Sequence, residues 1–307
     1  MKRAMKNKYV FVAVMLCAIL FLGMGLTNLY VWEAKEQDEV SDITIVTSFY
    51  PMYIATLNVV GDTDHVILKN LSEPQTGCLH DFQLTPKDMK LLSTADVFVI
   101  NGGGIESFME EVAAAYPQLT VIEACENTKL LADEGEKNAH AWMSIAAYES
   151  QVKTIVEALS EVDPVHKGQY QKNAFNYVKK LDSLKKRQKA IAEAASGQHV
   201  ILFHEAYDYV ADDYGLKVSC VLDLDEERQV SAGEVSDVLA AIERGHVNVI
   251  FAEELYGKSI GETVQKEADV QVIYLNPLNR GDYDKDSYID GMSENLRLLE
   301  QCFGVQE

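Results

Sequence analysis

The helical pattern between residues 164 and 196 is the feature that most constrains what this chain can fold into. One apolar stripe at helical spacing runs along it, formed by Tyr170, Ala174, Tyr177, Leu181, Leu184 and Ile191. Asp163 followed by Pro164 is typical of a helix start, and Gly197 is typical of a helix end. Its centre contains neither glycine nor proline, so the segment predicts a rigid helix of ~50 Å. We therefore expect a strut between two lobes rather than a flexible linker.

Short apolar runs alternate with helical stretches on both sides of this strut. Before it, the predicted strands are residues 43–48, 65–71, 95–101 and 119–124. After it, they are residues 199–203, 217–221, 247–252 and 270–275. Helices are expected between several strands, among them residues 86–93 and 105–116, with a final helix near 290–303. Strands separated by helices favour βαβ units and mostly parallel sheets.

The expected fold class is therefore α/β, with two Rossmann-like lobes joined by one long rigid α-helix. We expect the N-terminal lobe within residues 33–150, the linking helix region within 151–196 and the C-terminal lobe within 197–307. The chain has 307 residues, of which 48% are hydrophobic, and this is enough for a core in each lobe.

Residues 1–32 combine a basic cluster with an apolar run. The basic residues are Lys2, Arg3, Lys6 and Lys8, and residues 9–32 contain no charged side chain. As a helix, residues 9–32 would be ~36 Å long, which is enough to cross a bilayer with the basic flank in the cytoplasm. We expect a signal sequence or transmembrane anchor. The body would stay at the extracytoplasmic face of the membrane, or be secreted or periplasmic if the segment is cleaved.

The rest of the chain carries a strong excess of negative charge. The formal net charge is −21, and it is about −25 without residues 1–32, which contribute four basic groups and no acid. Such a body repels nucleic acid and anionic membrane surfaces, and it raises the local concentration of cations. Solubility alone explains the charge equally well. We expect no nucleic-acid partner, and we expect a monomer.

The five cysteines leave the disulfide pattern open. Cys17 follows Met15 and Leu16 in the apolar run, so it lacks the small neighbour expected before a lipid-modified cysteine. The other four allow three pairings: Cys78, Cys125, Cys220 and Cys302. A bridge between Cys220 and Cys302 would stay within one lobe, but the sequence alone does not establish it.

Ligands of open α/β sheets bind beyond the carboxyl ends of the strands, and this rule divides the seven histidines into two groups. His80 lies in the loop after the second predicted strand, His140 opens the helix that ends the first lobe, and His204 directly follows an apolar strand. We expect these three side chains to converge between the lobes. The others lie at strand starts or in the first turn of the strut: His65, His199, His246 and His166.

A transition metal is the ligand that fits this histidine set. Three neutral imidazoles suit Zn²⁺ and also Cu, Ni or Fe, whereas Mn²⁺ prefers more carboxylate. Glu253 and Asn276 follow two further strands at the same pole. A nearby acidic loop is interpreted as solvated surface, and it contains Asp223, Asp225, Glu226 and Glu227.

These motifs resemble those of the metal-binding solute-binding proteins of zinc and manganese ABC importers. The resemblance extends from about Ile43 to Phe303. In chain order, the matching motifs are Thr47-Ser48-Phe49-Tyr50-Pro51, His80-Asp81-Phe82 with Pro86, His140-Ala141-Trp142, Asp163-Pro164 with Tyr170, Asn173-Ala174 and Tyr177, His204-Glu205-Ala206-Tyr207 with Tyr214-Gly215-Leu216, and Leu275-Asn276-Pro277-Leu278. Their order and spacing together are highly specific.

The resemblance implies a receptor that captures a metal ion, Zn²⁺ or alternatively Mn²⁺, and delivers it to an ABC permease. It also implies two lobes bridged by one long helix, with His80, His140 and His204 as metal ligands. The fourth family position usually carries a carboxylate and falls on Asn276, whose neutral amide is a poor ligand. The fourth ligand therefore stays open among the Asn276 oxygen, a water molecule and a nearby acid such as Glu253. The histidine-rich loop common in zinc members is missing, because residues 126–138 contain no histidine.

Three other functions compete with this interpretation. A zinc enzyme would use the histidines with Glu205 or Glu253 as its base, but the chain has no HExxH motif and its histidines are dispersed. A receptor for haem, cobalamin or a siderophore would share the two lobes and the long helix, but it would need a broad pocket and no histidine triad. A surface adhesin is compatible with the resemblance, yet no residue specifically supports it. We expect a binding protein and not an enzyme.

Overall fold

The structure is a computed structural model that describes residues 12, 14–16, 18–24, 42–73, 79–80, 82–133, 135–224 and 228–305. The chain divides into a unit of Met1–Asp42 and a compact unit of Ile43–Glu307. Within the described part of the chain, no helix is both long enough and apolar enough to cross a membrane. Cys17 and most of the predicted span at residues 9–32 lie outside the described residues.

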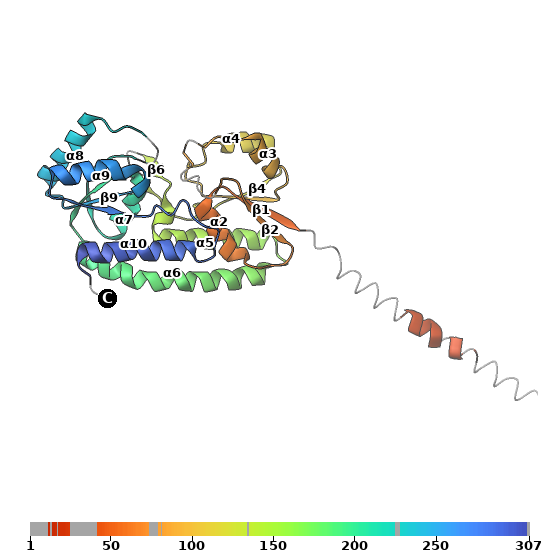
Figure 1. The fold of residues 1–307 in the computed structure, drawn as a ribbon. Coiled ribbons are helices and arrows are strands. Elements are labelled where there is room, and N and C mark those ends of the chain that lie inside the picture. The colour runs from red at the N-terminus through yellow and green to blue at the C-terminus, as the bar shows by residue number, and fades with distance from the viewer. Residues whose placement is uncertain are drawn as a thin grey trace, which may run out of the picture. The chain divides into compact units, whose positions relative to one another are not determined.

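The compact unit is built on two parallel sheets flanked by helices (Figure 1), which confirms the predicted α/β class. Over the described residues, the first sheet has the strand order β2-β1-β3-β4, and all its pairs are parallel. Its strands are β1 Ile43–Thr47, β2 Val66–Asn70, β3 Val97–Ile100 and β4 Thr120–Glu123. All four residues of β3 are buried, as expected for a strand of a parallel sheet that is covered on both faces.

The second sheet repeats this plan, with the strand order β10-β9-β7-β8 and parallel pairs throughout the described residues. Its strands are β7 His199–Leu202, β8 Lys217–Val221, β9 Val249–Ala252 and β10 Gln271–Tyr274. The central strand β9 is again fully buried. A small antiparallel pair, β5 Leu131–Asp133 and β6 Glu136–Asn138, was not predicted from the sequence and leads into His140.

Helices connect the strands and cover both sheets (Figure 1). In the first half they are α2 Tyr50–Val60, α3 Pro86–Leu92, α4 Met109–Ala115, the 3₁₀ helix η1 Ala141–Met143 and α5 Ile145–Val162. In the second half they are the 3₁₀ helix η2 Glu205–Tyr207, α7 Asp208–Asp213, α8 Ala232–Gly245, α9 Glu254–Glu267 and α10 Ser287–Phe303. Capping boxes at Thr85 and Ser231 explain where α3 and α8 begin, because each cap satisfies backbone N–H groups of the first turn.

The long helix between the two sheets is α6, Lys167–Ala195, with 29 residues and a length of ~44 Å. Its buried side chains are Tyr170, Ala174, Tyr177, Leu181, Leu184, Ile191 and Ala195, so the predicted apolar stripe is confirmed. Figure 1 shows α6 running along the lower edge of the compact unit, beside α5 and α10. One continuous helix therefore packs against helices from both halves of the chain.

The predicted start of this helix at Asp163 and Pro164 was wrong by three residues. Asp163 ends α5, and α6 begins at Lys167 after His166. The Asp163 carboxylate still serves the start of α6, because it accepts hydrogen bonds from the backbone N–H of His166 and from the hydroxyl of Tyr170. Pro164 instead lies in the turn between the two helices.

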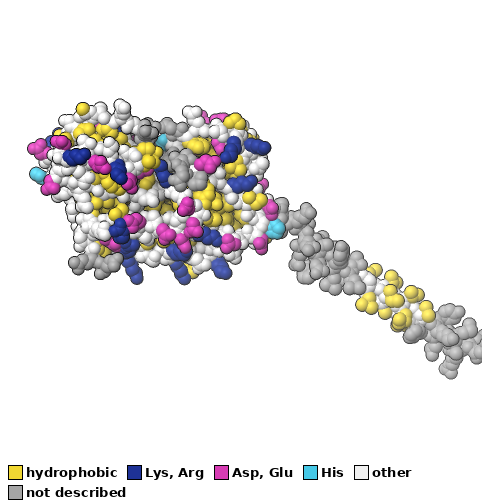
Figure 2. Space-filling view, in the orientation of Figure 1, with side chains coloured by type: hydrophobic (Ala, Val, Ile, Leu, Met, Phe, Trp, Pro, Cys, Tyr) yellow, Lys and Arg dark blue, Asp and Glu magenta, His cyan; other side chains and the backbone are white. Residues whose placement is uncertain are grey.

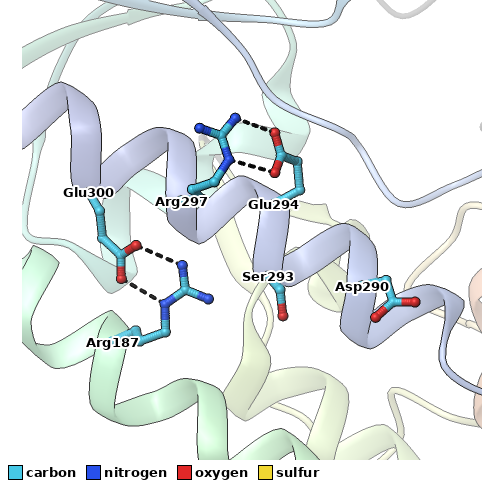
Figure 3. A pocket seen from close by; sticks show the side chains of 6 residues that line it. All are labelled: Arg187, Asp290, Ser293, Glu294, Arg297 and Glu300. Atoms are coloured by element: carbon cyan, nitrogen blue, oxygen red, sulfur yellow. Dashed lines mark hydrogen bonds and ion pairs between the residues drawn. The ribbon is translucent and has the colours of Figure 1, made fainter. Parts of the chain in front are cut away.

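An ion pair joins α10 to α6 (Figure 3). Arg187 of α6 donates two hydrogen bonds of 2.7 Å to the two carboxylate oxygens of Glu300 in α10. A second pair, Arg297 with Glu294, lies within α10 beside an open surface cavity of about 630 Å³. Because a bidentate pair fixes the orientation of both groups, the Arg187–Glu300 contact sets how the last helix lies on the strut.

Three cysteines in the described residues, Cys125, Cys220 and Cys302, have free thiols. The bridge considered between Cys220 and Cys302 is therefore not formed. Cys78 lies outside the described residues.

Candidate metal centre

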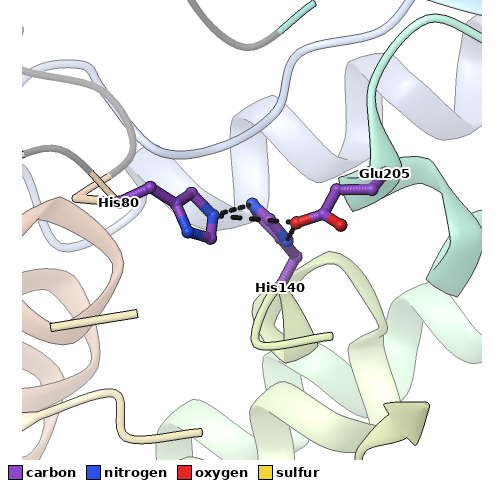
Figure 4. Close-up of side chains that lie close together, drawn as sticks. All are labelled: His80, His140 and Glu205. Carbon is purple, nitrogen blue, oxygen red and sulfur yellow. Dashed lines mark hydrogen bonds and ion pairs between the residues drawn. The ribbon is translucent and has the colours of Figure 1, made fainter. Parts of the chain in front are cut away.

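His80 lies between β2 and α3, and contacts of the described residues beside it hold it in place. The Ser107 hydroxyl donates a hydrogen bond of 3.3 Å to the carbonyl of His80. The backbone N–H of Phe82 donates to the carbonyl of Leu79, and the Phe82 ring packs edge-on against Phe108. The His80 ring points toward His140 (Figure 4). Asp81 lies outside the described residues.

His140 is fully buried and lies directly before η1. Its backbone N–H and its ring Nδ1 both contact Oδ1 of Asn138, at 3.0 and 2.9 Å. An amide oxygen can only accept, so Nδ1 carries the proton and Nε2 presents its lone pair. The amide of Asn138 is itself oriented, because its Nδ2 donates to the carbonyl of Glu205 and to the Asp208 carboxylate. Asn138 therefore selects the tautomer of His140 that is able to bind a metal through Nε2.

His204 follows β7 and is also fully buried. Its ring centroid is 5.1 Å from that of His140, and the two ring planes are almost perpendicular. Tyr207 packs edge-on against the His204 ring and donates a hydrogen bond of 2.7 Å to the carbonyl of Leu275. The His140 ring thus lies between the other two predicted histidines, with its centroid 5.1 Å from that of each, although His204 is not among the residues whose ligand atoms lie within 4.8 Å of one another.

Glu205 joins this cluster, although the sequence suggested it only as the base of an enzyme. The ligand atoms of His80, His140 and Glu205 lie within 4.8 Å of one another (Figure 4). Nε2 of His80 is 3.4 Å from Nε2 of His140 and 3.7 Å from Oε1 of Glu205. Two imidazole nitrogens that bind one tetrahedral Zn²⁺ at about 2.0–2.1 Å are about 3.3 Å apart. The histidine pair therefore already has the spacing of two zinc ligands.

Glu253, which the sequence offered as an alternative fourth ligand, lies behind His204. It follows β9, is 4% exposed, and places Oε2 at 3.9 Å from Nδ1 of His204. Its other oxygen forms an ion pair of 3.2 Å with Arg280. The carboxylate is therefore held between an imidazole and a guanidinium.

The side-chain oxygen of Asn276 is hydrogen-bonded within the turn in which the residue lies. Oδ1 accepts a hydrogen bond of 2.8 Å from the backbone N–H of Leu278, and the residue is exposed. Asn295 of α10 binds the backbone of Asn276 on both sides, accepting from its N–H and donating to its carbonyl. These contacts fix the orientation of the Asn276 amide within the turn that follows β10.

The remaining histidines have local structural contacts. His65 and His246 have positive φ angles of 58° and 49°, and His246 ends α8 in the left-handed conformation. The His199 ring contacts the hydroxyl of Ser219, and the His166 ring contacts the carboxylate of Asp163. These four histidines therefore lie at the starts of strands or at the ends of helices.

The cluster borders a cavity of about 960 Å³ that contains more acidic than basic side chains. The polar residues that line it include His80, Glu136, Lys137, Asn138, Glu205, Asp208 and Asp212. A concave wall with excess negative charge raises the local concentration of cations.

Burial lowers the pKa of His140 well below its ordinary value, and the neighbouring His204 and His80 rings lower it further. A low pKa keeps the imidazole neutral, and the neutral form is the one that binds metal ions. The buried position of His140 thus favours metal binding over protonation.

Comparison with known proteins gives consistent matches. The family model of the periplasmic zinc-uptake complex component A matches residues 45–302. The high-affinity zinc uptake system protein ZnuA of Bacillus subtilis is 30% identical over 286 residues, which cover 85% of this chain and 88% of that protein.

Two solved structures are also similar. The solute-binding protein FpvC of Pseudomonas aeruginosa, in complex with Ni²⁺, superposes with a TM-score of 0.75 at 30% identity and covers 85% of this chain and 98% of that one. Zn(II)-bound AdcA of Streptococcus pneumoniae superposes with a TM-score of 0.74 at 28% identity. The match covers 85% of this chain and 57% of AdcA, so this chain spans little more than half of that protein.

Proposed function

The chain belongs to the family of periplasmic zinc-uptake complex component A proteins, and on this premise we propose that it is an extracytoplasmic receptor that captures Zn²⁺ for an ABC permease. The observation that carries the proposal is the pair of Nε2 atoms of His80 and His140, 3.4 Å apart at the edge of an acidic cavity. That separation matches one edge of a tetrahedral zinc site.

The proposed ligands are His80, His140 and His204, with the carboxylate of Glu205 in the fourth position. Glu205 is favoured because its Oε1 is 3.7 Å from Nε2 of His80, and because His80, His140 and Glu205 each offer one ligand atom within 4.8 Å of the others. Glu253 is better suited to orient His204. Arg280 holds the Glu253 carboxylate beside Nδ1 of the His204 ring. Such a carboxylate–histidine pair fixes the ring of a metal ligand.

This ligand set favours Zn²⁺ over Mn²⁺. Imidazole nitrogens suit zinc, whereas manganese gains more from oxygen ligands, and only one of the four proposed ligands is a carboxylate. The similar proteins support the same class of ligand, because one is named for zinc uptake and another was solved with bound zinc.

The proposed site also favours capture over catalysis. Catalytic zinc sites have three protein ligands and one open position, whereas four protein ligands close the coordination sphere. The ligands come from both halves of the chain, so binding and release of the ion would be coupled to the relative position of those halves. Such coupling suits a receptor that delivers its ion to a permease. The predicted N-terminal anchor would keep the receptor at the membrane.

Elemental analysis of the full chain, purified without added metal, tests the proposal. We expect about one zinc ion per chain, as in a single four-ligand site, and loss of that zinc in His140→Ala. A chain that contains no transition metal, or a His140→Ala variant that retains its zinc, would contradict the proposal.

A further inference from the structure

The basic residues of this acidic chain are concentrated on α6. The helix contains eight of them and only two acids, Asp182 and Glu193, although the chain as a whole has a net charge of −21. The eight are Lys167, Lys172, Lys179, Lys180, Lys185, Lys186, Arg187 and Lys189. Figure 2 shows dark blue side chains projecting from the lower edge of the compact unit, where α6 runs in Figure 1. The average charge of the body therefore does not describe this face.

Several of these cations are bound to carboxylates, and each such contact fixes α6 to its surroundings or to itself. Lys180 pairs with Asp286, and Lys185 pairs with Glu149 and Asp182. Arg187 pairs with Glu300, and Lys189 is 4.0 Å from Glu193. These ion pairs explain how some of the basic side chains of α6 stabilise the fold. A smaller set of basic side chains on α6 points to solvent.

Three exposed lysines follow one another at intervals of seven residues: Lys172, Lys179 and Lys186. Among the residues that the structure describes, none forms a salt bridge with these three side chains. A spacing of seven residues keeps them on one side of a helix, over a length of ~21 Å. We call them, together with Phe175, the α6 stripe.

Phe175 gives the α6 stripe an apolar centre. Its side chain is 60% exposed, and the ammonium group of Lys179 lies 4.2 Å from the centroid of its ring. At a membrane surface, an exposed ring can reach the acyl boundary while ammonium groups beside it contact phosphates. Single exposed apolar side chains are common on protein surfaces, so it is the combination of this ring with the neighbouring lysines that bears on a partner.

We propose that the α6 stripe is a docking surface for the anionic phospholipid headgroups of the membrane. Its shape fits a flat surface, because the stripe is a straight helix face of ~21 Å. Each lysine near an anionic membrane adds a small attraction that salt screens, so three lysines and one phenylalanine give a weak, salt-sensitive contact. Such a contact orients a protein that is already confined to the membrane, and it does not by itself recruit one from solution.

Lysine footprinting tests the proposal on the full chain. An amine-reactive reagent is applied in the presence of excess phosphatidylglycerol vesicles or phosphatidylcholine vesicles, and labelling of each lysine is measured by mass spectrometry. We expect labelling of Lys172, Lys179 and Lys186 to fall about threefold or more on the anionic vesicles only, and to recover in about 1 M salt. Three exposed lysines elsewhere serve as internal controls and should not change: Lys90, Lys217 and Lys266.

A pair of matched variants separates the stripe from overall charge. K172Q/K179Q/K186Q should lose the preference for anionic over neutral vesicles, whereas K90Q/K217Q/K266Q removes the same charge and should keep it. Equal losses in both variants, or equal labelling on both vesicles, would overturn the proposal. Protection of the stripe that appears without lipid and grows with protein concentration would also overturn it, because a second copy of the chain would then be the partner.

Discussion

The orientation of the His140 ring depends on one amide group. Asn138 accepts from Nδ1 of His140 at 2.9 Å and so leaves Nε2 available for a metal ion. Partners of this kind contribute about 10- to 100-fold to metal affinity. We therefore predict that Asn138→Ala weakens Zn²⁺ binding by about that factor, measured by competition with a chromophoric chelator.

Asn176→Ala, on the exposed side of α6, is the control for this measurement and should bind zinc as the unaltered chain does. Equal affinities of Asn138→Ala and Asn176→Ala would show that Asn138 does not orient the ligand.

Substitutions that change the charge at two positions test which residue is the fourth ligand. Glu205→Gln removes a carboxylate from the cluster, and it should weaken Mn²⁺ binding more than Zn²⁺ binding because hard cations gain most from carboxylates. Asn276→Asp should leave the Mn/Zn ratio unchanged, because the side-chain oxygen at this position is bound to the N–H of Leu278. A competition titration of both metals measures the ratios. A higher preference for Mn²⁺ in Asn276→Asp would place residue 276 at the metal and remove the case for Glu205.

The sequence was enough to propose the three histidines as a site, but not the residues that surround them. His80, His140 and His204 follow from the order of strands and helices, which decides the pole at which each one lies. Asn138 and Glu205 are adjacent or nearly adjacent to these histidines in sequence. Their roles nevertheless depend on the directions of side chains in a β-hairpin and a 3₁₀ helix. No periodic pattern in the sequence predicts these two elements.

At the scale of helices and strands, a partly buried carboxylate joins three helices. Asp213 of α7 accepts from the hydroxyl of Ser144 before α5 and from the amide of Gln188 in α6. Burial, together with the charge of the neighbouring Asp212, raises the pKa of Asp213 to about 6. The folded chain therefore holds this proton more tightly than the unfolded chain does. Stability falls as pH rises from about 4 to about 6, and the cost persists above that window.

Asp213→Asn should remove this cost. We predict that it increases the free energy of unfolding at pH 7 by roughly 1 kcal/mol, and that the gain disappears near pH 4. Urea unfolding at the two pH values measures both quantities. A gain of the same size at pH 4, or a loss at pH 7, would show that the ionised carboxylate is not destabilising here.

The predicted strands and the observed ones share their centres and differ at their ends. The apolar runs at residues 95–101 and 247–252 extend beyond β3 and β9, because residues such as Val247 are buried without pairing in a sheet. The start of α6 was misplaced for a related reason. Asp163 and Pro164 have the composition of a helix start, but α5 continues to Val162 and the turn needs residues 163–166. Local composition locates an element well, whereas its ends depend on the packing of its neighbours.

At the scale of the whole molecule, the proposed ligands connect the two halves of the chain. His80 and His140 come from the first half, and His204 and Glu205 come from the second. An ion bound only by the folded chain raises its stability by about 2.7 kcal/mol at a free concentration of 100 times Kd. We predict that zinc raises the melting temperature by several degrees and that a chelator reverses the change, which calorimetry measures. A melting temperature that does not respond to zinc would contradict a site that spans both halves.

Calorimetric titration of Zn²⁺ into five histidine variants tests the central claim most directly. His80, His140, His204, His65 and His246 are each replaced by Asn, which tolerates the positive φ angles at the last two positions. We predict that the first three variants lose most of their zinc affinity, because a four-coordinate site cannot readily replace a lost imidazole, whereas His65→Asn and His246→Asn bind zinc as the unaltered chain does. Equal losses at His204 and His246, or full affinity in the first three variants, would contradict the proposed metal site.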